Sequence, residues 1–565
     1  MTEQAPQTNH TDDYLRIWQQ NVNGSSNSQL DLIHSTHTKH NDILAIQEPY
    51  INFLGLAQAT PSWTVVYPHG HQDDPQKTRA TILINRTTLS SNAWTQIDIP
   101  SPDIVAIQSV SLQGTLRLFN IYNDCNHDNS QLALQEYMRR VPALGNLPGP
   151  IRYVWLGDFN RHSPIWDEAR NHHLFTSENL RAAGQLIQLY TEYNLVMTLP
   201  PGVATLEALA TKNRTRVDNV FCDAGTLQLV DMCTTREDWR PVKTDHFPII
   251  THLRLFAERK GTQPRHNFRK VDWEELKDDL KKRLDALPKP RRIQSVVEAE
   301  GKLAQLEAMV ADVIDLYVHV IRAHPRAKRW WTKELTAKRW EVQTAARRAR
   351  EVWGIEGHPD IECYRRCRND FAQNIKDAKD KHWNQWLAEM DGSTIWDTHR
   401  LVNSPPSDGG AARVPVLQTR DPVSQETMEV AVSNDDKARM LYQLFFPGKP
   451  LASSVPTDYE YPEPKWEYAP VTNALIHKAI QSLRPFKASK PGSIPNSILI
   501  NAADMLVPHI GPIFRATDEL QWYPQHWKVT QTPVIRKPGW HLIQNRAAPL
   551  PGPQHGRPGI SSSYG

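Results

Sequence analysis

Short apolar runs follow one another through the first 255 residues, and they predict β-strands. Several runs alternate apolar and polar positions and are rich in Val, Ile, Leu and aromatic residues, as half-buried strands are. Two longer stretches repeat apolar residues at every third or fourth position, which predicts helices. The expected strands are 14–19, 43–46, 63–67, 81–84, 104–110, 115–121 and 151–156, and the expected helices are 131–141 and 180–193. Mixed strands and helices over this length predict an α/β layered domain.

The pattern changes after about residue 258. Charged residues become dense and the apolar spacing becomes helical, whereas the later segments alternate between Pro-rich and apolar stretches. A short helix is expected near 436–446, inside an otherwise linker-like stretch. The predicted division is a disordered N-terminus (1–13), an α/β domain (14–257), a helical basic connector (258–400), a linker (401–470), a further folded fragment (471–540) and a disordered tail (541–565).

Length and composition agree with several folded parts. A chain of 565 residues is too long for one core, so about two to four domains are expected. The apolar share is 39%, and the 42 prolines indicate Pro-rich connections between the folded parts. The net charge is only +3, so charge matters only where it clusters.

One basic cluster lies at 326–350, inside the helical connector. Nine Lys and Arg residues face only two Glu there, and three Trp residues are interleaved with them. Basic residues mixed with aromatics can hold a nucleic-acid backbone and stack on bases. The alternative is an amphipathic helix whose Trp side chains are buried in a bundle. Both interpretations remain open from the sequence, and the cluster can also serve as a nuclear localisation signal.

The cysteines and the N-terminus bear on the compartment. Five Cys residues show no metal-type pairing, and Cys363 and Cys367 lie one helical turn apart, as packing residues do. An odd, sparse set fits a reducing compartment. The polar N-terminus lacks the apolar core of a signal peptide, and no run of eighteen apolar residues is present. The expected location is therefore intracellular.

Polar residues stand where the predicted strands end. Gly157-Asp158-Phe159-Asn160 follows the strand 151–156 directly, which places the Asp158 carboxylate at the rim of a sheet. Asn160 is expected to point the same way, because side chains repeat every two residues along a strand. Such a pair can orient a water molecule and hold a phosphate oxygen. The alternative is an Asp turn that merely ends the strand.

Two further motifs carry charge at strand boundaries. Glu48 follows the strand 43–46, and an acidic group at such a rim costs free energy unless a partner, such as Mg²⁺, pairs with it. Asp245-His246 precedes the apolar run 249–253, and a neighbouring carboxylate fixes the tautomer of a His and raises its pKa. Alone, each motif is more typical of an ordinary surface turn or loop. Asn21, Tyr122 and Asp218 also lie in or after strands.

The order of these motifs is more specific than any one of them. Asn, Glu, Tyr, Asp-x-Asn, Asp and Asp-His occur in this order, nearly all at strand ends, across residues 15–255. The arrangement resembles the endonuclease/exonuclease/phosphatase superfamily, whose DNase I-like fold is a four-layer α/β sandwich. The resemblance implies hydrolysis of phosphodiester bonds with the help of a divalent cation, Mg²⁺ or alternatively Mn²⁺.

The resemblance implies a metal set. Glu48 would be the main metal ligand, with Asn21 beside it and Asp245 near the ion. Some members of the superfamily carry Asp where this chain has Asn23, so a second ligand from that position is in doubt.

The resemblance also implies a catalytic set. Asp158 would position or deprotonate the attacking water, and Asn160 would contact the scissile phosphate. Tyr122 would hydrogen-bond a phosphate oxygen or the leaving group. Asp218 would orient His246, which would bind the phosphate or act as the base. A metal and an imidazolium together offset the charge that repels an incoming hydroxide.

Other segments indicate which group within the superfamily the chain resembles. His162-Ser163-Pro164-Ile165-Trp166 and Gln47-Glu48-Pro49-Tyr50 are similar to endonucleases of non-LTR, LINE-type retrotransposons. Residues 487–539 resemble the N-terminal edge of a LINE reverse transcriptase. The chain contains no Tyr-x-Asp-Asp sequence, and polymerases need paired carboxylates for two metal ions, so no polymerase activity is expected.

The predicted function is therefore a DNA endonuclease that nicks target DNA for a retrotransposon, with DNA as its partner, RNA as a second partner of the connector, and a nuclear location. Two alternatives remain. One is another phosphodiesterase of the same fold, such as an abasic-site nuclease or a phosphoinositide phosphatase. The other is an inactive remnant that at most binds nucleic acid.

Overall fold

The computed structural model describes most of the chain up to Met390 and shorter segments beyond it. The described residues are 14–60, 62–111, 114–140, 149–208, 210–255, 257–259, 265–321, 330–390, 414, 417–420, 424, 427–431, 434–446, 448, 458–460, 462–463, 469–487, 493–529 and 534. The predictions for 1–13 and 541–565 lie outside this range. Among the helices of the described part, none combines the length and the apolar character that a membrane crossing requires.

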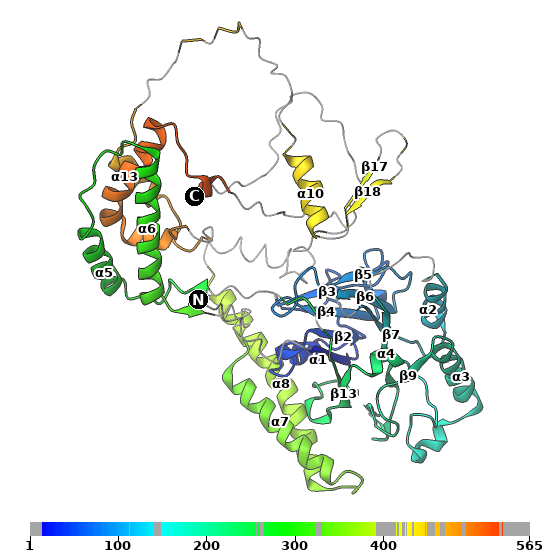
Figure 1. Cartoon of the computed structure of the whole chain (residues 1–565). Helices are drawn as coiled ribbons and strands as arrows, with labels where there is room; N and C mark the ends of the chain where they lie inside the picture. The colour runs from blue at the N-terminus through cyan, green and yellow to red at the C-terminus, as the bar shows by residue number, and fades with distance from the viewer. Residues whose placement is uncertain are drawn as a thin grey trace.

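Two six-stranded sheets form the N-terminal domain (Figure 1). The first has the order β13-β14-β1-β2-β4-β3, and the second has the order β5-β6-β7-β8-β12-β9. The strands of the first sheet are β1 (Leu15–Asn21), β2 (Ile43–Gln47), β3 (Trp63–Val66), β4 (Ala80–Asn85), β13 (Val230–Thr235) and β14 (Ile249–Leu253). Those of the second sheet are β5 (Thr95–Ile97), β6 (Ile104–Ser111), β7 (Gly114–Tyr122), β8 (Ile151–Asp158), β9 (Leu195–Met197) and β12 (Asp218–Asp223).

The two-residue repeat of the strands divides their side chains between separate cores. In β1, Ile17 joins the core between the two sheets, whereas Trp18 points to the outer core of the first sheet. In β8, Val154 and Leu156 join the same central core, whereas Trp155 belongs to the outer core of the second sheet. The sheets therefore pack face to face, and each buries both of its faces.

Helices cover both outer faces. α2 (Asn129–Arg140) and α3 (Ser177–Glu192) supply the outer core of the second sheet. α1 (Ser26–His34), α7 (Lys333–Glu351) and α8 (Pro359–Ala388) supply that of the first. The N-terminal domain is thus a four-layer α/β sandwich, which confirms the predicted fold class. Helix α1 was not predicted, although Ser25 caps it by accepting a hydrogen bond from the backbone N–H of Ser28.

The helical region 258–400 divides between two cores. α7 and α8 pack side by side on the first sheet of the N-terminal domain (Figure 1). α5 (Trp273–Asp285) and α6 (Val296–Tyr317) instead share a core with α12 (Asn496–Asn501) and α13 (Ala503–Glu519). Among the described residues, the remaining α-helices and strands are α4 (Ala224–Leu227), α10 (Asn434–Phe445), α11 (Asn473–Gln481) and the short hairpins β10 (Leu206–Glu207) with β11 (Arg214–Thr215), β15 (Arg265–His266) with β16 (Val320–Ile321), and β17 (Leu417–Arg420) with β18 (Thr427–Ala431).

The basic cluster at 326–350 combines packing residues with exposed charge. Residues 326–329 lie outside the described part. Trp330 is buried in the outer core of the first sheet, and Arg339 is buried in an ion pair with Asp31 of α1. Trp340 is 52% exposed, and the exposed basic residues are Lys333, Arg347, Arg348 and Arg350. The packing interpretation therefore holds for Trp330 and Arg339. Cys363 and Cys367, which the spacing predicted to be packing residues, both lie half-buried on α8 and form no disulfide bond.

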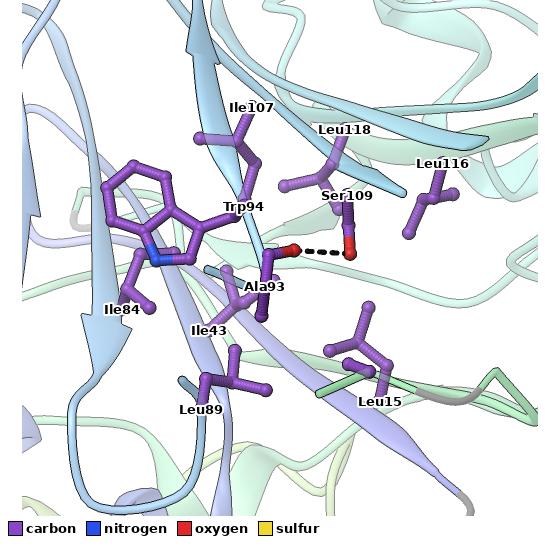
Figure 2. A pocket seen from close by; sticks show the side chains of 11 residues that line it. Leu15, Ile43, Ile84, Leu89, Ala93, Trp94, Ile107, Ser109, Leu116 and Leu118 are labelled. Atoms are coloured by element: carbon purple, nitrogen blue, oxygen red, sulfur yellow. Dashed lines mark hydrogen bonds between the residues drawn. The ribbon is translucent and has the colours of Figure 1, made fainter. Parts of the chain in front are cut away.

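An apolar pocket lies between the sheets, near the start of β1 and of β7 (Figure 2). Ser109 is its one hydroxyl-bearing lining residue, and its Oγ donates a hydrogen bond to the carbonyl oxygen of Ala93 at 2.6 Å. The lining residues are Leu15, Ile43, Ile84, Leu89, Ala93, Trp94, Ile107, Ser109, Leu116, Leu118 and Ala257. Such a lining suits neither a phosphate nor a metal ion, and the polar strand ends lie at the opposite edge of the sheets.

Candidate active site

Strand register brings the predicted residues to one edge of the sandwich. β1 and β2 are parallel with Asn21 opposite Gln47, so Glu48 leaves the sheet beside Asn21. β7 and β8 are parallel with Tyr122 opposite Asp158. β12 runs antiparallel to β8, and its first residue, Asp218, lies opposite Asp158. The last residues of four strands and the first residue of a fifth therefore share one rim.

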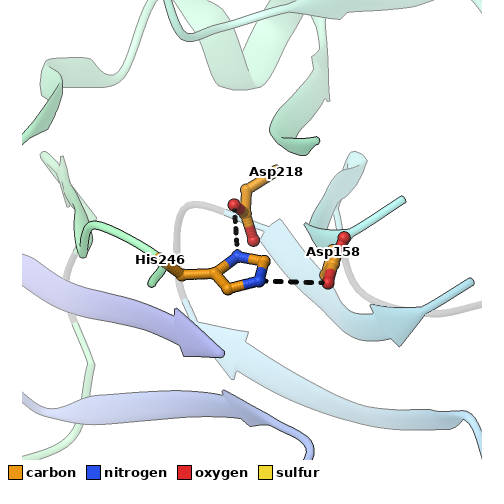
Figure 3. A group of neighbouring side chains, drawn as sticks. All are labelled: Asp158, Asp218 and His246. Carbon is orange, nitrogen blue, oxygen red and sulfur yellow. Dashed lines mark hydrogen bonds and ion pairs between the residues drawn. The ribbon is translucent and has the colours of Figure 1, made fainter. Parts of the chain in front are cut away.

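The centre of this rim is a buried cluster of Asp158, Asp218 and His246 (Figure 3). The Nδ1 atom of His246 lies 2.9 Å from Oδ2 of Asp218. Its Nε2 atom lies 3.8 Å from Oδ2 of Asp158 and 3.9 Å from Oδ1 of Asp245. Segments far apart in the sequence thus place one imidazole among three carboxylates, and Asp218 holds its orientation.

The cluster strongly perturbs the protonation of its members. Burial, followed by repulsion from Asp218, raises the pKa of Asp158. Burial opposes a charge on His246, but the carboxylates of Asp218, Asp158 and Asp245 outweigh it and raise the pKa of His246 to about 10. The three carboxylates therefore favour the protonated form of the buried imidazole.

Asp158 is oriented by two donors. The side-chain amide of Asn21 donates to Oδ2 of Asp158 at 2.9 Å, and the backbone N–H of Asn160 donates to Oδ1 at 3.1 Å. The predicted two-residue repeat from Asp158 to Asn160 was wrong, because β8 ends at Asp158 and Asn160 has a φ of 50°. Asn tolerates this left-handed conformation, which turns the backbone N–H back onto the carboxylate. The Asn160 side chain donates to the carbonyl oxygen of Asn123 at 2.9 Å.

Glu48 and Tyr122 share a partner that the sequence did not reveal. The Nη2 atom of Arg79 lies 2.7 Å from Oε1 of Glu48 and 2.5 Å from the hydroxyl of Tyr122. Burial, followed by repulsion from Glu48, raises the pKa of Tyr122, so the phenol stays neutral and can donate. Arg79 directly precedes β4, which pairs with β2. Most of the predicted site residues lie at the ends of strands, whereas Arg79 lies before the start of one.

The loop after β1 connects the predicted metal ligands. Its residue Asn23 donates from its side chain to Oδ1 of Asp245 at 3.2 Å, and from its backbone to Oδ1 of Asn21 at 2.8 Å. The next residue, Gly24, donates its N–H to the carbonyl oxygen of Glu48 at 2.8 Å. Asn23 therefore orients the surrounding oxygen atoms. The loop brings Asn21, Glu48 and Asp245 to one side of the His246 cluster.

The donor atoms of this side suit a hard divalent cation. Glu48, Asp158 and Asp245 offer carboxylate oxygens and Asn21 offers an amide oxygen, and Mg²⁺ prefers such ligands. Asp158, Asp218 and His246 also stand close enough together for metal binding, with ligand atoms within 4.8 Å of one another. Within that group, Nδ1 of His246 is engaged by Asp218, so Nε2 is the ring atom that faces the other carboxylates. Glu48, Asn21 and Asp245 carry the donor types that such an ion prefers.

Comparison with known proteins connects this site to nucleases. Residues 116–250 match the family model described as endonuclease-reverse transcriptase. The matched segment includes Tyr122, Asp158, Asn160, Asp218 and His246. This part of the N-terminal domain is therefore similar to that family. Among curated protein sequences, none matches the chain.

Several solved structures are similar to the N-terminal domain. The endonuclease domain of TRAS1, a telomere-specific non-LTR retrotransposon, is 21% identical over 43% of this chain and 99% of its own, with a TM-score of 0.33. The AP endonuclease LMAP from Leishmania major is 11% identical over 45% of this chain and 92% of its own, with a TM-score of 0.35. The 3'-5' exonuclease NExo from Neisseria meningitidis is 18% identical over 42% of this chain and 99% of its own, with a TM-score of 0.31.

Proposed function

We propose that this protein is a DNA endonuclease that depends on a divalent cation, Mg²⁺ or Mn²⁺, and nicks target DNA for a LINE-type retrotransposon. The observation that carries the proposal is the buried imidazole of His246 between Asp218 and Asp158, at one rim with Asn21, Glu48 and Tyr122. The match of this segment to the endonuclease-reverse transcriptase model supports a DNA substrate. A nuclear location follows from that substrate.

The side chains suit attack of water on a phosphodiester. Asp158, fixed by Asn21 and by the backbone of Asn160, holds the attacking water and accepts its proton. As the new P–O bond forms, the P–O bond to the leaving oxygen breaks, and that oxygen takes a proton from solvent water. The His246 imidazolium faces the negative charge that develops on the phosphate, and the neutral phenol of Tyr122 donates to a phosphate oxygen. Glu48, Asn21 and Asp245 would hold a divalent ion, which would supply further positive charge there.

A plasmid-nicking assay tests this function directly. Supercoiled DNA is expected to become open circles with Mg²⁺ or Mn²⁺, to stay intact with EDTA, and to be nicked again after excess Mg²⁺ is restored. An oligonucleotide with one abasic site, beside its undamaged twin, separates the target-nicking enzyme from a repair nuclease. Cleavage confined to the abasic strand assigns the alternative activity, and folded protein that cuts neither DNA contradicts the proposal.

Asp218→Asn tests the charge on His246. The variant keeps an oxygen that can accept from Nδ1 but removes the carboxylate that most strongly raises the pKa of His246. Because that pKa falls, the imidazolium is lost at a lower pH, and the alkaline limb of the pH–rate profile is expected to move to lower pH. The rate near neutral pH is expected to fall on the order of 100-fold. An unmoved alkaline limb would show that His246 does not act as a cation.

Exposed basic side chains of α7 are candidates for a second surface that binds nucleic acid. Lys333, Arg347 and Arg348 are exposed there and support the proposal that the connector binds RNA. We likewise propose that residues 471–540 are related to the N-terminal edge of a reverse transcriptase.

A further inference from the structure

His246 lies on a loop whose position depends on its surroundings. The loop, residues 240–247, connects the short turn η5 (Glu237–Trp239) to β14 and contains no helix or strand of its own beyond one bridge between His246 and Leu206. It carries Thr244, Asp245 and His246 to the rim of the sheets. A loop of this kind holds a catalytic side chain accurately only where packed neighbours fix its backbone.

Helix α8 holds this loop through Arg368. The Nη2 atom of Arg368 donates to the carbonyl oxygen of Pro241 at 3.0 Å and also to that of Thr244. The hydroxyl of Thr244 in turn donates to the carbonyl oxygen of Asn21 at 2.7 Å and accepts from the backbone N–H of His246 at 3.3 Å. One guanidinium from the connector therefore fixes the residue that joins His246 to β1.

Helix α7 reaches the same loop through α1. Arg339 donates to the backbone carbonyl of Asp31 at 2.8 Å and pairs with its carboxylate. The other oxygen of that carboxylate accepts from the backbone N–H of Val242 at 3.0 Å. Both side chains of the ion pair are buried, with 7% and 2% of their areas exposed, so the contact is shielded from solvent.

A third contact comes from Tyr364 of α8. Its hydroxyl accepts from Nη2 of Arg240 at 3.1 Å, and Arg240 pairs with Glu207 at 2.9 Å. The backbone N–H of Glu207 donates to the carbonyl oxygen of Asp245 at 3.0 Å. Arg368 thus holds the loop directly at Pro241 and Thr244. Arg339 acts through Asp31 on Val242. Tyr364 holds Arg240 and acts through Glu207 on Asp245.

Partial burial of the Arg368 guanidinium is costly, and packing alone does not require this side chain. Burial, followed by repulsion from Arg240, lowers the pKa of Arg368 to about 10. An apolar side chain of similar length often replaces a buried charge with little loss of stability. Carbonyl oxygens, in contrast, need a donor with more than one N–H to be held together, and a guanidinium supplies it.

We propose that helices α7 and α8 are part of the catalytic unit, and that Arg368 is a positioning residue that holds loop 240–247 so that His246 meets Asp158 and Asp218. This inference rests on the proposed nicking activity. It extends the functional unit beyond the predicted boundary at residue 257, because the side chains that fix the loop come from residues 339–368.

The test compares variants of the full chain. Arg368→Met keeps the length of the side chain and removes its donors, Arg368→Lys restores one donor group, and Asn369→Ala alters the exposed neighbour as a control. Arg368→Met is expected to lower kcat about 10- to 100-fold with KM for DNA unchanged, because small displacements of a catalytic group cost rates of this order. Arg368→Lys should recover part of the loss, and Asn369→Ala should match the wild type.

A double variant separates positioning from general damage. If Arg368 acts through His246, then Arg368→Met should cause no further loss of rate in a His246→Ala background. An additive loss, or a raised KM with unchanged kcat, would overturn the assignment. Hydrogen exchange reads the loop without catalysis: the amides of residues 240–247 should exchange faster in Arg368→Met. Wild-type protein that nicks no DNA defeats the proposed function, whereas unchanged exchange defeats this inference.

Discussion

Asp158→Asn is expected to lower the nicking rate about 100- to 1,000-fold, because it removes the carboxylate that holds the attacking water and its proton. The variant has nearly the same size, so packing at the end of β8 is preserved. One oxygen of Asp158 accepts from Asn21 and the other from the backbone of Asn160, so the new amide must turn an N–H toward one of these donors. The loss therefore combines a missing charge with a misdirected contact.

Single-turnover nicking of supercoiled plasmid measures this effect, with circular dichroism as the check on folding. Asp98→Asn is the matched control, since Asp98 pairs with His69 and its side chain is 78% exposed. The control is expected to nick at the wild-type rate. A folded Asp158→Asn protein that retains more than about a tenth of the wild-type rate would remove Asp158 from the chemistry.

Alternation along the strands made the sandwich predictable. Ile17 and Trp18 face different cores, as do Val154 and Trp155, and such alternation is visible in a single sequence. Short strands carry too few residues for this signal. β5 (Thr95–Ile97) and β9 (Leu195–Met197) were therefore missed, and so was the hairpin of β17 and β18 inside the predicted linker.

The site was predictable where its residues end strands and hidden where they do not. Asn21, Tyr122 and Asp158 are the last residues of β1, β7 and β8, and the structure brings them to one rim as expected. Arg79 stands before a strand and has no such signature. The partners of Asp31 and Thr244 could not be predicted either, since Arg339 lies 308 residues from Asp31 and only tertiary packing brings charges so distant together.

The role of the connector was only partly predictable for a related reason. Its basic residues and Trp side chains have one composition but two environments, because a helix that packs on a sheet buries one face and exposes the other. Arg339 lies on the buried face of α7, and Trp330 is buried in the same core just before the helix begins, whereas Lys333 and Arg347 are exposed. A helical pattern shows that an amphipathic face exists. It does not show which partner covers it.

Gly157→Ala is expected to lower the free energy of unfolding of the N-terminal domain by at least about 3 kcal/mol, the range of severe steric damage in a core. Gly157 has a φ of 150°, and a Cβ atom there would lie 1.8 Å from the carbonyl oxygen of Ile121. That oxygen belongs to the backbone of β7, which pairs with β8 in parallel register at this position. Relief of the clash requires the two strands to separate.

The displacement would fall directly on the active site, because Tyr122 and Asp158 are the next residues of these strands. Nicking should therefore fail together with stability. Gly184→Ala is the matched control: Gly184 is exposed in α3 with nothing within 4 Å of its added Cβ, so alanine should stabilise the helix by about 0.5–1 kcal/mol. Urea unfolding followed by Trp fluorescence measures both. A Gly157→Ala midpoint equal to the wild-type midpoint would mean that β7 and β8 do not meet at Ile121 and Gly157, and the rim that joins Tyr122 to Asp158 would lose its structural basis.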